Sequence, residues 1–145
     1  MQIQWYPGHM AKARRMLEEN LKLIDVVVEL VDARAPLATR NPDFDALFSQ
    51  KSRVILLNKS DLASAEQTKK WIEYYKAQNI NAIAFVSTSS AKRKAAVSLI
   101  EAAAADKVAK MKEKGVIKTV RAMVVGIPNV GKSTFINRIA GETKA

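Results

Sequence analysis

The sequence has 145 residues, a length typical of one domain, and its 48% hydrophobic content is that of a globular protein with a sizeable core. It contains no cysteine, which excludes a disulfide framework and a cysteine metal site, and its apolar runs are far shorter than the roughly 20 residues that span a bilayer. The 24 Lys and Arg against 14 Asp and Glu give a net charge of +10, which favours a polyanionic partner such as nucleic acid, although a merely basic soluble protein has the same charge.

The first eight residues are polar and aromatic and lack the apolar segment of a secretory signal, so we expect a cytoplasmic protein with no membrane partner. The segment from Trp5 to Met10 is a predicted turn. A helix is predicted from about residue 9 to residue 23, because apolar residues recur there at spacings of three and four. His9 is the only histidine in the chain, and a helix cap is its ordinary role at such a position.

The run Val26–Val31 predicts a buried parallel strand because it is rich in β-branched residues. Asp32-Ala33-Arg34 follows at its carboxyl end, where open α/β sheets place their ligand sites. A loop over residues 36–40 leads to Asn41-Pro42, a pair typical of a helix start. A short helix with Phe44, Leu47 and Phe48 is expected next.

A second strand, Val54–Leu57, runs directly into Asn58-Lys59-Ser60-Asp61. Ser64 and Gln67 form a capping-box pattern that begins a helix reaching about residue 78. That helix has a cluster of two aromatic residues and an isoleucine at helical spacing, Trp71, Ile72 and Tyr75. We interpret this cluster as core rather than as a base-stacking platform.

A third strand, Ala82–Val86, is followed by one long predicted helix over residues 92–114 that Gly115 should end. The region from 107 to 121 is strongly basic, and its cations either contact RNA phosphates or form a solvated helix face and linker. These cations are Lys107, Lys110, Lys112, Lys114, Lys118 and Arg121.

The segment Gly126–Ser133 fits G-x-x-x-x-G-K-[ST], the phosphate-binding P-loop, and lies between a predicted strand, Ala122–Val125, and a predicted helix. Its two glycines let the backbone approach phosphate closely, and N–H groups at the helix N-terminus then face the anion. The Lys132 ammonium can reach the β- and γ-phosphates, and the Ser133 hydroxyl can bind Mg²⁺. A chance glycine turn is the alternative, and the strand–loop–helix context argues against it. The predicted phosphate-binding residues are Asn129, Val130, Gly131, Lys132, Ser133 and Thr134.

Asn58-Lys59-Ser60-Asp61 matches the N-K-x-D guanine-recognition motif, a weak signal alone that gains specificity beside a P-loop. The Asp61 carboxylate can accept hydrogen bonds from guanine N1–H and the 2-amino group, donors that adenine lacks there. The Lys59 stem can lie against the base plane, and Asn58 can tie the loop to the P-loop. Ser87-Thr88 follows the next strand, where GTPases direct a backbone N–H at guanine O6; Ser90-Ala91 is a second candidate for that role.

The guanine motifs precede the P-loop, which is the reverse of the order in an ordinary GTPase. The whole chain resembles the YlqF/YawG family of circularly permuted GTPases. The resemblance rests on this motif order, on the P-loop, on Asp32-Ala33-Arg34 and on the segment Trp5–Ala13 (W-Y-P-G-H-M-A-K-A). The resemblance implies a three-layer α/β P-loop NTPase fold with a mostly parallel sheet, in which the P-loop strand lies beside the strand Val26–Val31.

The resemblance also implies ligands and partners. Family members bind GTP and GDP with Mg²⁺, act in assembly of the large (50S) ribosomal subunit and contact ribosomal RNA. They lack the usual switch glutamine, and the His9 position has the catalytic, water-positioning role. Asn129 matches a P-loop asparagine that relatives use to hold K⁺, so the implied metal ligands are Ser133 for Mg²⁺ and Asn129 for K⁺.

The sequence also departs from the family, because it ends at Ala145 before a switch I threonine, a switch II D-x-P-G and a helical C-terminal domain. We therefore expect one permuted GTPase domain, residues 1–145, incomplete at its C-terminus, that binds nucleotide weakly without turnover. The free edge of the P-loop strand should be exposed and favour self-association. Two other functions are an ATP-dependent P-loop enzyme, in which Asn58–Asp61 is coincidental, and a non-catalytic RNA-binding module with a vestigial P-loop.

Overall fold

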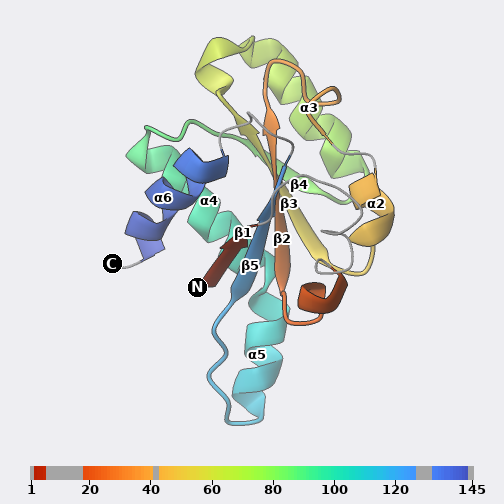
Figure 1. The fold of residues 1–145 in the computed structure, drawn as a ribbon, viewed down its shortest axis with the longest axis vertical. Helices are drawn as coiled ribbons and strands as arrows, with labels where there is room; N and C mark the ends of the chain where they lie inside the picture. Colours follow the sequence, from red (N-terminus) through yellow and green to blue (C-terminus); the bar gives the residue numbers. More distant parts are fainter. Residues whose placement is uncertain (1, 6–17, 41–42, 127–131, 144–145) are drawn as a thin grey trace.

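A parallel sheet forms the middle layer of the molecule in the computed structural model, which describes residues 2–5, 18–40, 43–126 and 132–143 (Figure 1). Its strand order is β1-β5-β2-β3-β4, and every neighbouring pair is parallel. The four predicted strands are confirmed with small shifts at their ends. The strands are β1 Gln2–Trp5, β2 Val26–Asp32, β3 Ser52–Asn58, β4 Asn81–Ala84 and β5 Arg121–Val125.

Strand β2 is the centre of the sheet, between β5 and β3, and all seven of its residues are buried. Its aliphatic, β-branched sequence suits a strand that helices cover on both faces. The predicted neighbourhood of β2 and the P-loop strand β5 is confirmed, because Val26 to Glu29 pair with Ala122 to Val125.

Helices α4 (Ser90–Ala103) and α6 (Lys132–Thr143) cover one face of the sheet (Figure 1). Even-numbered residues of β2 and β3, such as Val28 and Leu56, point into this layer with Phe85 and Phe135. The rings of Phe85 and Phe135 meet edge to face with centroids 5.3 Å apart, so the helix after the P-loop packs directly on the chain after β4.

Helices α2 (Asp43–Leu47) and α3 (Ala65–Ala77) cover the opposite face. The apolar side chains there form two separate clusters, one with Phe44 and Phe48 and the other with Tyr75. Tyr75 is fully buried, and Trp71 and Ile72 pack against the second cluster, which confirms that this aromatic group belongs to the core.

The N-terminal segment corrects one prediction. Residues 2–5 form an unpredicted strand, β1, which pairs in parallel with β5, from Gln2 opposite Arg121 to Trp5 opposite Val124. The predicted exposed edge of the P-loop strand is therefore wrong, because β1 satisfies the backbone groups on that side. The strand is too short to show a clear alternating pattern, and its partner lies at the other end of the chain.

The long helix predicted over residues 92–114 is two helices, α4 and α5 (Ala105–Glu113). Ala104 leaves helical geometry at φ −103° and ψ 4°, yet it stays buried and the apolar stripe runs on to Val108. Periodicity alone cannot detect such a break, since the stripe is continuous through it. After the break α5 projects beyond the amino ends of the strands (Figure 1).

Local end signals were predicted well. The Ser64 hydroxyl accepts the Gln67 N–H at the start of α3, and Gly115 ends α5 with φ +78° in the left-handed region. Residues 18–21 are helical, as predicted, whereas the rest of the expected N-terminal helix lies outside the described residues.

Candidate nucleotide-binding site

The predicted nucleotide motifs meet at the carboxyl edge of the sheet. Asp32 and Asn58 are paired in register at the ends of β2 and β3. The P-loop strand β5 ends at Val125 opposite Glu29, and α6 begins at Lys132. Since all these strands are parallel, their following loops leave the sheet on the same side, where α/β proteins bind ligands.

The guanine-recognition segment is joined to both of its neighbours in the sheet. The Asn58 carbonyl accepts the Ala33 N–H at 2.8 Å. Lys59 turns the chain in the left-handed region at φ 58° and leads into the short 3-10 helix η1, Ser60–Leu62. The Ser60 N–H and hydroxyl both donate to the Phe85 carbonyl, at 3.1 and 3.0 Å. These contacts hold the segment between the loops that follow β2 and β4.

Asn58 and Asp61 differ in exposure as a guanine site requires. Asn58 is 3% exposed, at the end of its strand, where it can fix the loop. Asp61 is exposed, so its carboxylate is accessible to a ligand. Lys59 is half-buried between them. The three predicted base-binding residues therefore lie in one turn at the end of β3, at the same edge of the sheet as the end of the P-loop strand β5, with β2 between the two strands.

The loop after β4 contains the residues predicted to face guanine O6. Ser87 is half-buried and Thr88 is exposed, and the Ser87 carbonyl accepts a hydrogen bond from Arg93 at 2.9 Å. Ser89 caps α4 by accepting the Lys92 N–H, so the alternative pair Ser90-Ala91 belongs to the first turn of that helix. Both pairs lie close to the guanine segment, because Ser60 bonds to Phe85 two residues earlier.

The P-loop has the expected strand before it and the expected helix after it. Val125 and Gly126 are buried, α6 starts at Lys132, and Thr134 is exposed in its first turn. Four predicted site residues lie outside the described residues: His9, Asn129, Val130 and Gly131. The side chains of Lys132 and Ser133 also lie outside the described part of the chain. The strand–loop–helix context that the motif needs is therefore present.

Asp32-Ala33-Arg34 forms a closed ionic turn at the same edge. The Arg34 guanidinium donates to both carboxylate oxygens of Asp32, at 2.9 and 2.6 Å, and the Arg34 N–H adds a third bond at 2.9 Å. These contacts lower the pKa of Asp32 below its usual value against the opposing effect of burial, and the Lys59 charge lowers it further. The Asp61 charge in turn acts on Arg34, so the two loops form one electrostatic unit.

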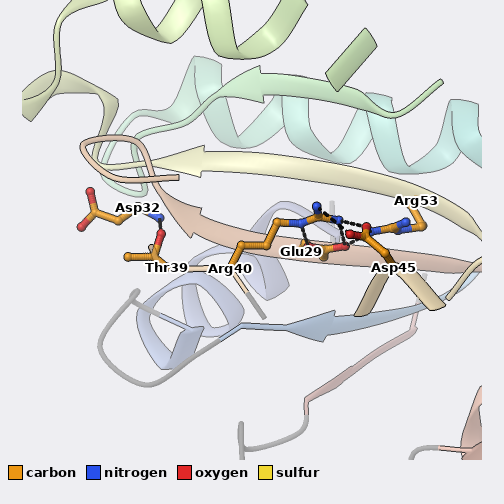
Figure 2. Close-up of polar contacts among 6 residues, drawn as sticks. All are labelled: Glu29, Asp32, Thr39, Arg40, Asp45 and Arg53. Atoms are coloured by element: carbon orange, nitrogen blue, oxygen red, sulfur yellow. Dashed lines mark hydrogen bonds and ion pairs between the residues drawn. The ribbon is translucent and has the colours of Figure 1, made fainter. Parts of the chain in front are cut away.

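Sequence reasoning missed a buried ionic cluster beneath this turn (Figure 2). Glu29, 1% exposed in the middle of β2, binds Arg40 through two contacts of 2.7 and 3.1 Å and also binds Arg53. Asp45 of α2 bridges the same arginines, at 2.6 Å to Arg40 and 3.0 Å to Arg53. We define these four residues as the buried ionic cluster, although the Asp45 side chain at its rim is 55% exposed. Its sequence signal was a lone glutamate in an aliphatic strand, which must find cationic partners when buried.

The buried ionic cluster fixes the far end of the loop that begins at Asp32. The Thr39 hydroxyl accepts the Asp32 N–H at 2.9 Å and donates to the Ala35 carbonyl at 2.7 Å (Figure 2). The next residue, Arg40, enters the cluster, and its guanidinium lies 5.7 Å from the centre of the Tyr75 ring. The loop is thus held at both ends, and the Asp32–Arg34 pair is positioned beside the guanine segment.

Within the part of the chain that the structure describes, no three His, Cys, Asp or Glu side chains come together as a metal site. P-loop proteins bind a nucleotide-dependent cation through a hydroxyl and the phosphates rather than through a carboxylate cage. The order of strand, P-loop and helix fits such a cation beside Ser133.

Comparisons with known proteins agree with this geometry. The family described as "50S ribosome-binding GTPase" matches residues 121–145. "Ribosome biogenesis GTPase A" of Priestia megaterium is 51% identical over 144 residues, covering 98% of this chain and 50% of that protein. The protein of the same name from Thermotoga maritima is 40% identical over 140 residues, covering 97% and 47%.

A solved structure gives the same result at the level of the fold. GNP-bound YlqF from T. maritima matches with a TM-score of 0.63 and 38% identity, covering 88% of this chain and 47% of that one. A GDP-bound structure of YlqF matches with the same TM-score and 37% identity. The chain spans about half the length of the curated relatives it matches.

Proposed function

We propose that the carboxyl edge of the sheet binds GTP and GDP and serves GTP hydrolysis in assembly of the large ribosomal subunit. Two findings support this proposal: the chain has the circularly permuted GTPase fold, and it is homologous over nearly its whole length to the ribosome biogenesis GTPase A proteins. The observation that carries this proposal is the exposed Asp61 in η1, which the Ser60–Phe85 bonds hold at the carboxyl edge of the sheet where the P-loop strand also ends. The proposed domain is residues 1–145.

Base recognition is assigned to the guanine segment. Asp61 accepts the N1–H and 2-amino donors of guanine, and the Lys59 stem lies against the base. Asn58, buried at the end of β3, ties this loop to the P-loop. A backbone N–H of Ser87 or Thr88 faces guanine O6. Adenine cannot satisfy Asp61, because an unpaired polar group at a desolvated site loses free energy.

Phosphate binding is assigned to the P-loop and the first turn of α6. The residues that hold the phosphates are Asn129, Val130, Gly131, Lys132, Ser133 and Thr134. Lys132 neutralises the β- and γ-phosphates, and Ser133 ligates Mg²⁺, which stabilises charge on the phosphoryl oxygens when it is bound. Asn129 is the proposed K⁺ ligand, and His9 is the proposed residue that orients the attacking water.

The proposed partners are the large ribosomal subunit and its RNA, in the cytoplasm. The net charge of +10 supports a polyanionic partner. No helix in the described ranges combines the length and the apolar character that crossing a membrane requires.

Nucleotide competition tests the proposal directly. Isothermal titration of the chain with GDP, ADP and XDP, in Mg²⁺ with either K⁺ or Na⁺, should show binding of GDP in preference to the other two. Equal binding of ADP and GDP would contradict the guanine assignment. Ribosomal particles that bind the chain equally with GTP, with GDP and without nucleotide would favour a module that binds RNA independently of its P-loop.

A further inference from the structure

A basic groove lies at the amino end of the sheet, on the side away from the nucleotide motifs. Residues 22–25, helix α5 and the segment 114–121 line it, and its volume is about 730 Å³. Strands β2 and β5 both start here and run away from it, and α5 projects past their starts (Figure 1). We call this feature the amino-end groove. Its basic lining residues are Lys22, Lys107, Lys110, Lys114, Lys118 and Arg121.

One carboxylate, Asp25, belongs to the lining residues of the groove. Asp25 is 4% exposed and accepts the Arg121 N–H at 2.9 Å. It also pairs with Lys118 at 3.1 Å and with Lys107 at 3.4 Å. Burial opposes its charge, but these donors outweigh burial and the pKa of Asp25 lies below its usual value. The Asp25 carboxylate is therefore already paired with groups of the protein. This one negative charge cannot compensate most of the positive charge of the groove.

Several lysines that lack a carboxylate partner lie close together in the amino-end groove. In the described ranges Lys22, Lys110 and Lys114 have no ion pair with a carboxylate. Lys107 and Lys110 of α5 and its C-cap residue Lys114 follow each other at spacings of three and four, which places them on one side of the helix. Lys51 lies close by and donates to the Ile24 carbonyl at 3.0 Å; burial and then the Lys107 charge lower its pKa. This end of the molecule thus holds more cations than its own anions balance.

Apolar side chains are exposed between these cations. Ile117 is 97% exposed, and Leu23 and Val116 are 55% and 44% exposed. Lysines that flank exposed aliphatic groups suit a polyanion that also offers apolar surface, as RNA does with its phosphates and the faces of unstacked bases. An acidic protein segment would also use the charges, so displacement of RNA by polyglutamate is one outcome of the test.

We propose that the amino-end groove binds a phosphodiester segment of ribosomal RNA while the carboxyl edge holds guanine nucleotide. The inference rests on the proposed ribosomal partner and assigns that partner a site. The two ligands occupy opposite ends of the same strands, so neither blocks the other. Neutralising phosphates with the groove lysines releases counterions, which makes the affinity depend on salt.

Charge reversal with a matched control tests the site. The groove variant is Lys110→Glu with Lys114→Glu, and the control is Lys69→Glu with Lys76→Glu on exposed positions of α3. Both pairs change the net charge equally. The probe is a fluorescein-labelled fragment of large-subunit ribosomal RNA, followed by anisotropy over a series of KCl concentrations. We expect the groove variant to lose at least tenfold affinity and to reduce the salt slope by about 1.4–1.8, the value for two phosphate contacts. The control should lose less than threefold.

The outcomes separate this inference from the proposed function. Equal losses in both variants would overturn the groove site and leave the RNA partner standing. Wild-type protein that binds no RNA but binds GDP would refute the RNA partner and keep the guanine site. Polyglutamate that displaces the RNA and binds wild type more tightly than the groove variant would mean an acidic protein ligand, and it would overturn the RNA assignment. GDP affinity should be unchanged in the groove variant, which also verifies that it folds.

Discussion

We propose that single residues at the carboxyl edge decide which base the site accepts. Asp61 is exposed, whereas its neighbours in the motif are buried or half-buried, so it is the group free to pair with a ligand. Asp61→Asn replaces two acceptors with one acceptor and one donor. We expect GDP binding to weaken by about 2–4 kcal/mol and XDP binding to improve, since the amide matches the carbonyl of xanthine. Titration calorimetry with both nucleotides measures the change.

The control for this prediction is Asp106→Asn, which removes an exposed carboxylate on α5 at the other end of the sheet. It should leave the GDP and XDP affinities unchanged. An Asp61→Asn variant that keeps the GDP preference of the wild type would show that another group reads the base.

Lys132 is the residue on which the phosphate half of the proposed site should depend. It begins α6, directly after the P-loop, and is the side-chain cation that the motif directs at the phosphates. Lys132→Ala should lower nucleotide affinity at least tenfold, about 1.4 kcal/mol. Lys69→Ala on α3 removes a charge elsewhere and serves as the control. Unchanged GDP affinity in a folded Lys132→Ala variant would contradict the P-loop assignment.

At the scale of elements, the buried ionic cluster joins β2, β3, α2 and the loop from Asp32 to Arg40 (Figure 2). It also separates the two apolar clusters on its face of the sheet, one around Phe44 and the other around Tyr75. Burial opposes the charge of Arg40, but its carboxylate partners outweigh burial and raise its pKa. The cluster therefore acts as a charged link between elements rather than as part of a continuous apolar core.

Breaking this link should be costly. Arg40→Met leaves Glu29 buried with Arg53 as its remaining cation, and we expect a loss of about 3–5 kcal/mol in the free energy of unfolding. The double variant Glu29→Leu with Arg40→Met removes both charges and should recover part of that loss. Urea unfolding at neutral pH measures all three proteins. A loss below about 1 kcal/mol for Arg40→Met would mean that the pair contributes no more than a surface salt bridge.

At the scale of the whole molecule, acidic pH should destabilise the fold, because the pKa values of Asp25, Asp32 and Asp45 are all lowered. A carboxylate with a lowered folded pKa stabilises above its unfolded pKa, about 3.9, and loses this contribution as the pH falls through the folded value. Stability should thus decline progressively from about pH 5 downward. Asp25→Asn should be less stable than wild type at pH 7 and show a shallower decline.

Urea midpoints between pH 7 and pH 3 test this prediction. The difference between wild type and Asp25→Asn should shrink as the pH falls, since Asp25 loses its charge in the wild type as well. Asp106→Asn, a substitution on the exposed side of α5, should keep the wild-type dependence. Parallel curves for wild type and Asp25→Asn would show that the lysine contacts of Asp25 do not stabilise the fold.

The sequence by itself determined the fold class, the four strands that were predicted, the helix caps and the order of the nucleotide motifs. These features depend on local chemistry: β-branched runs form buried strands, Ser64 and Gly115 satisfy helix ends, and glycines suit a phosphate loop. The permuted order of the motifs was also sufficient to predict the circularly permuted GTPase fold, which the similarity to YlqF confirms.

Only the tertiary structure decided several of the contacts between distant segments. Residues far apart in the chain meet in three places: where β1 pairs with β5, where Glu29 binds its partners, and in the lining of the amino-end groove. The break at Ala104 was also hidden, because a continuous apolar stripe is compatible with one helix or two. Local patterns record the burial and turn preference of a residue, whereas its contacts depend on how the strands are ordered in the sheet.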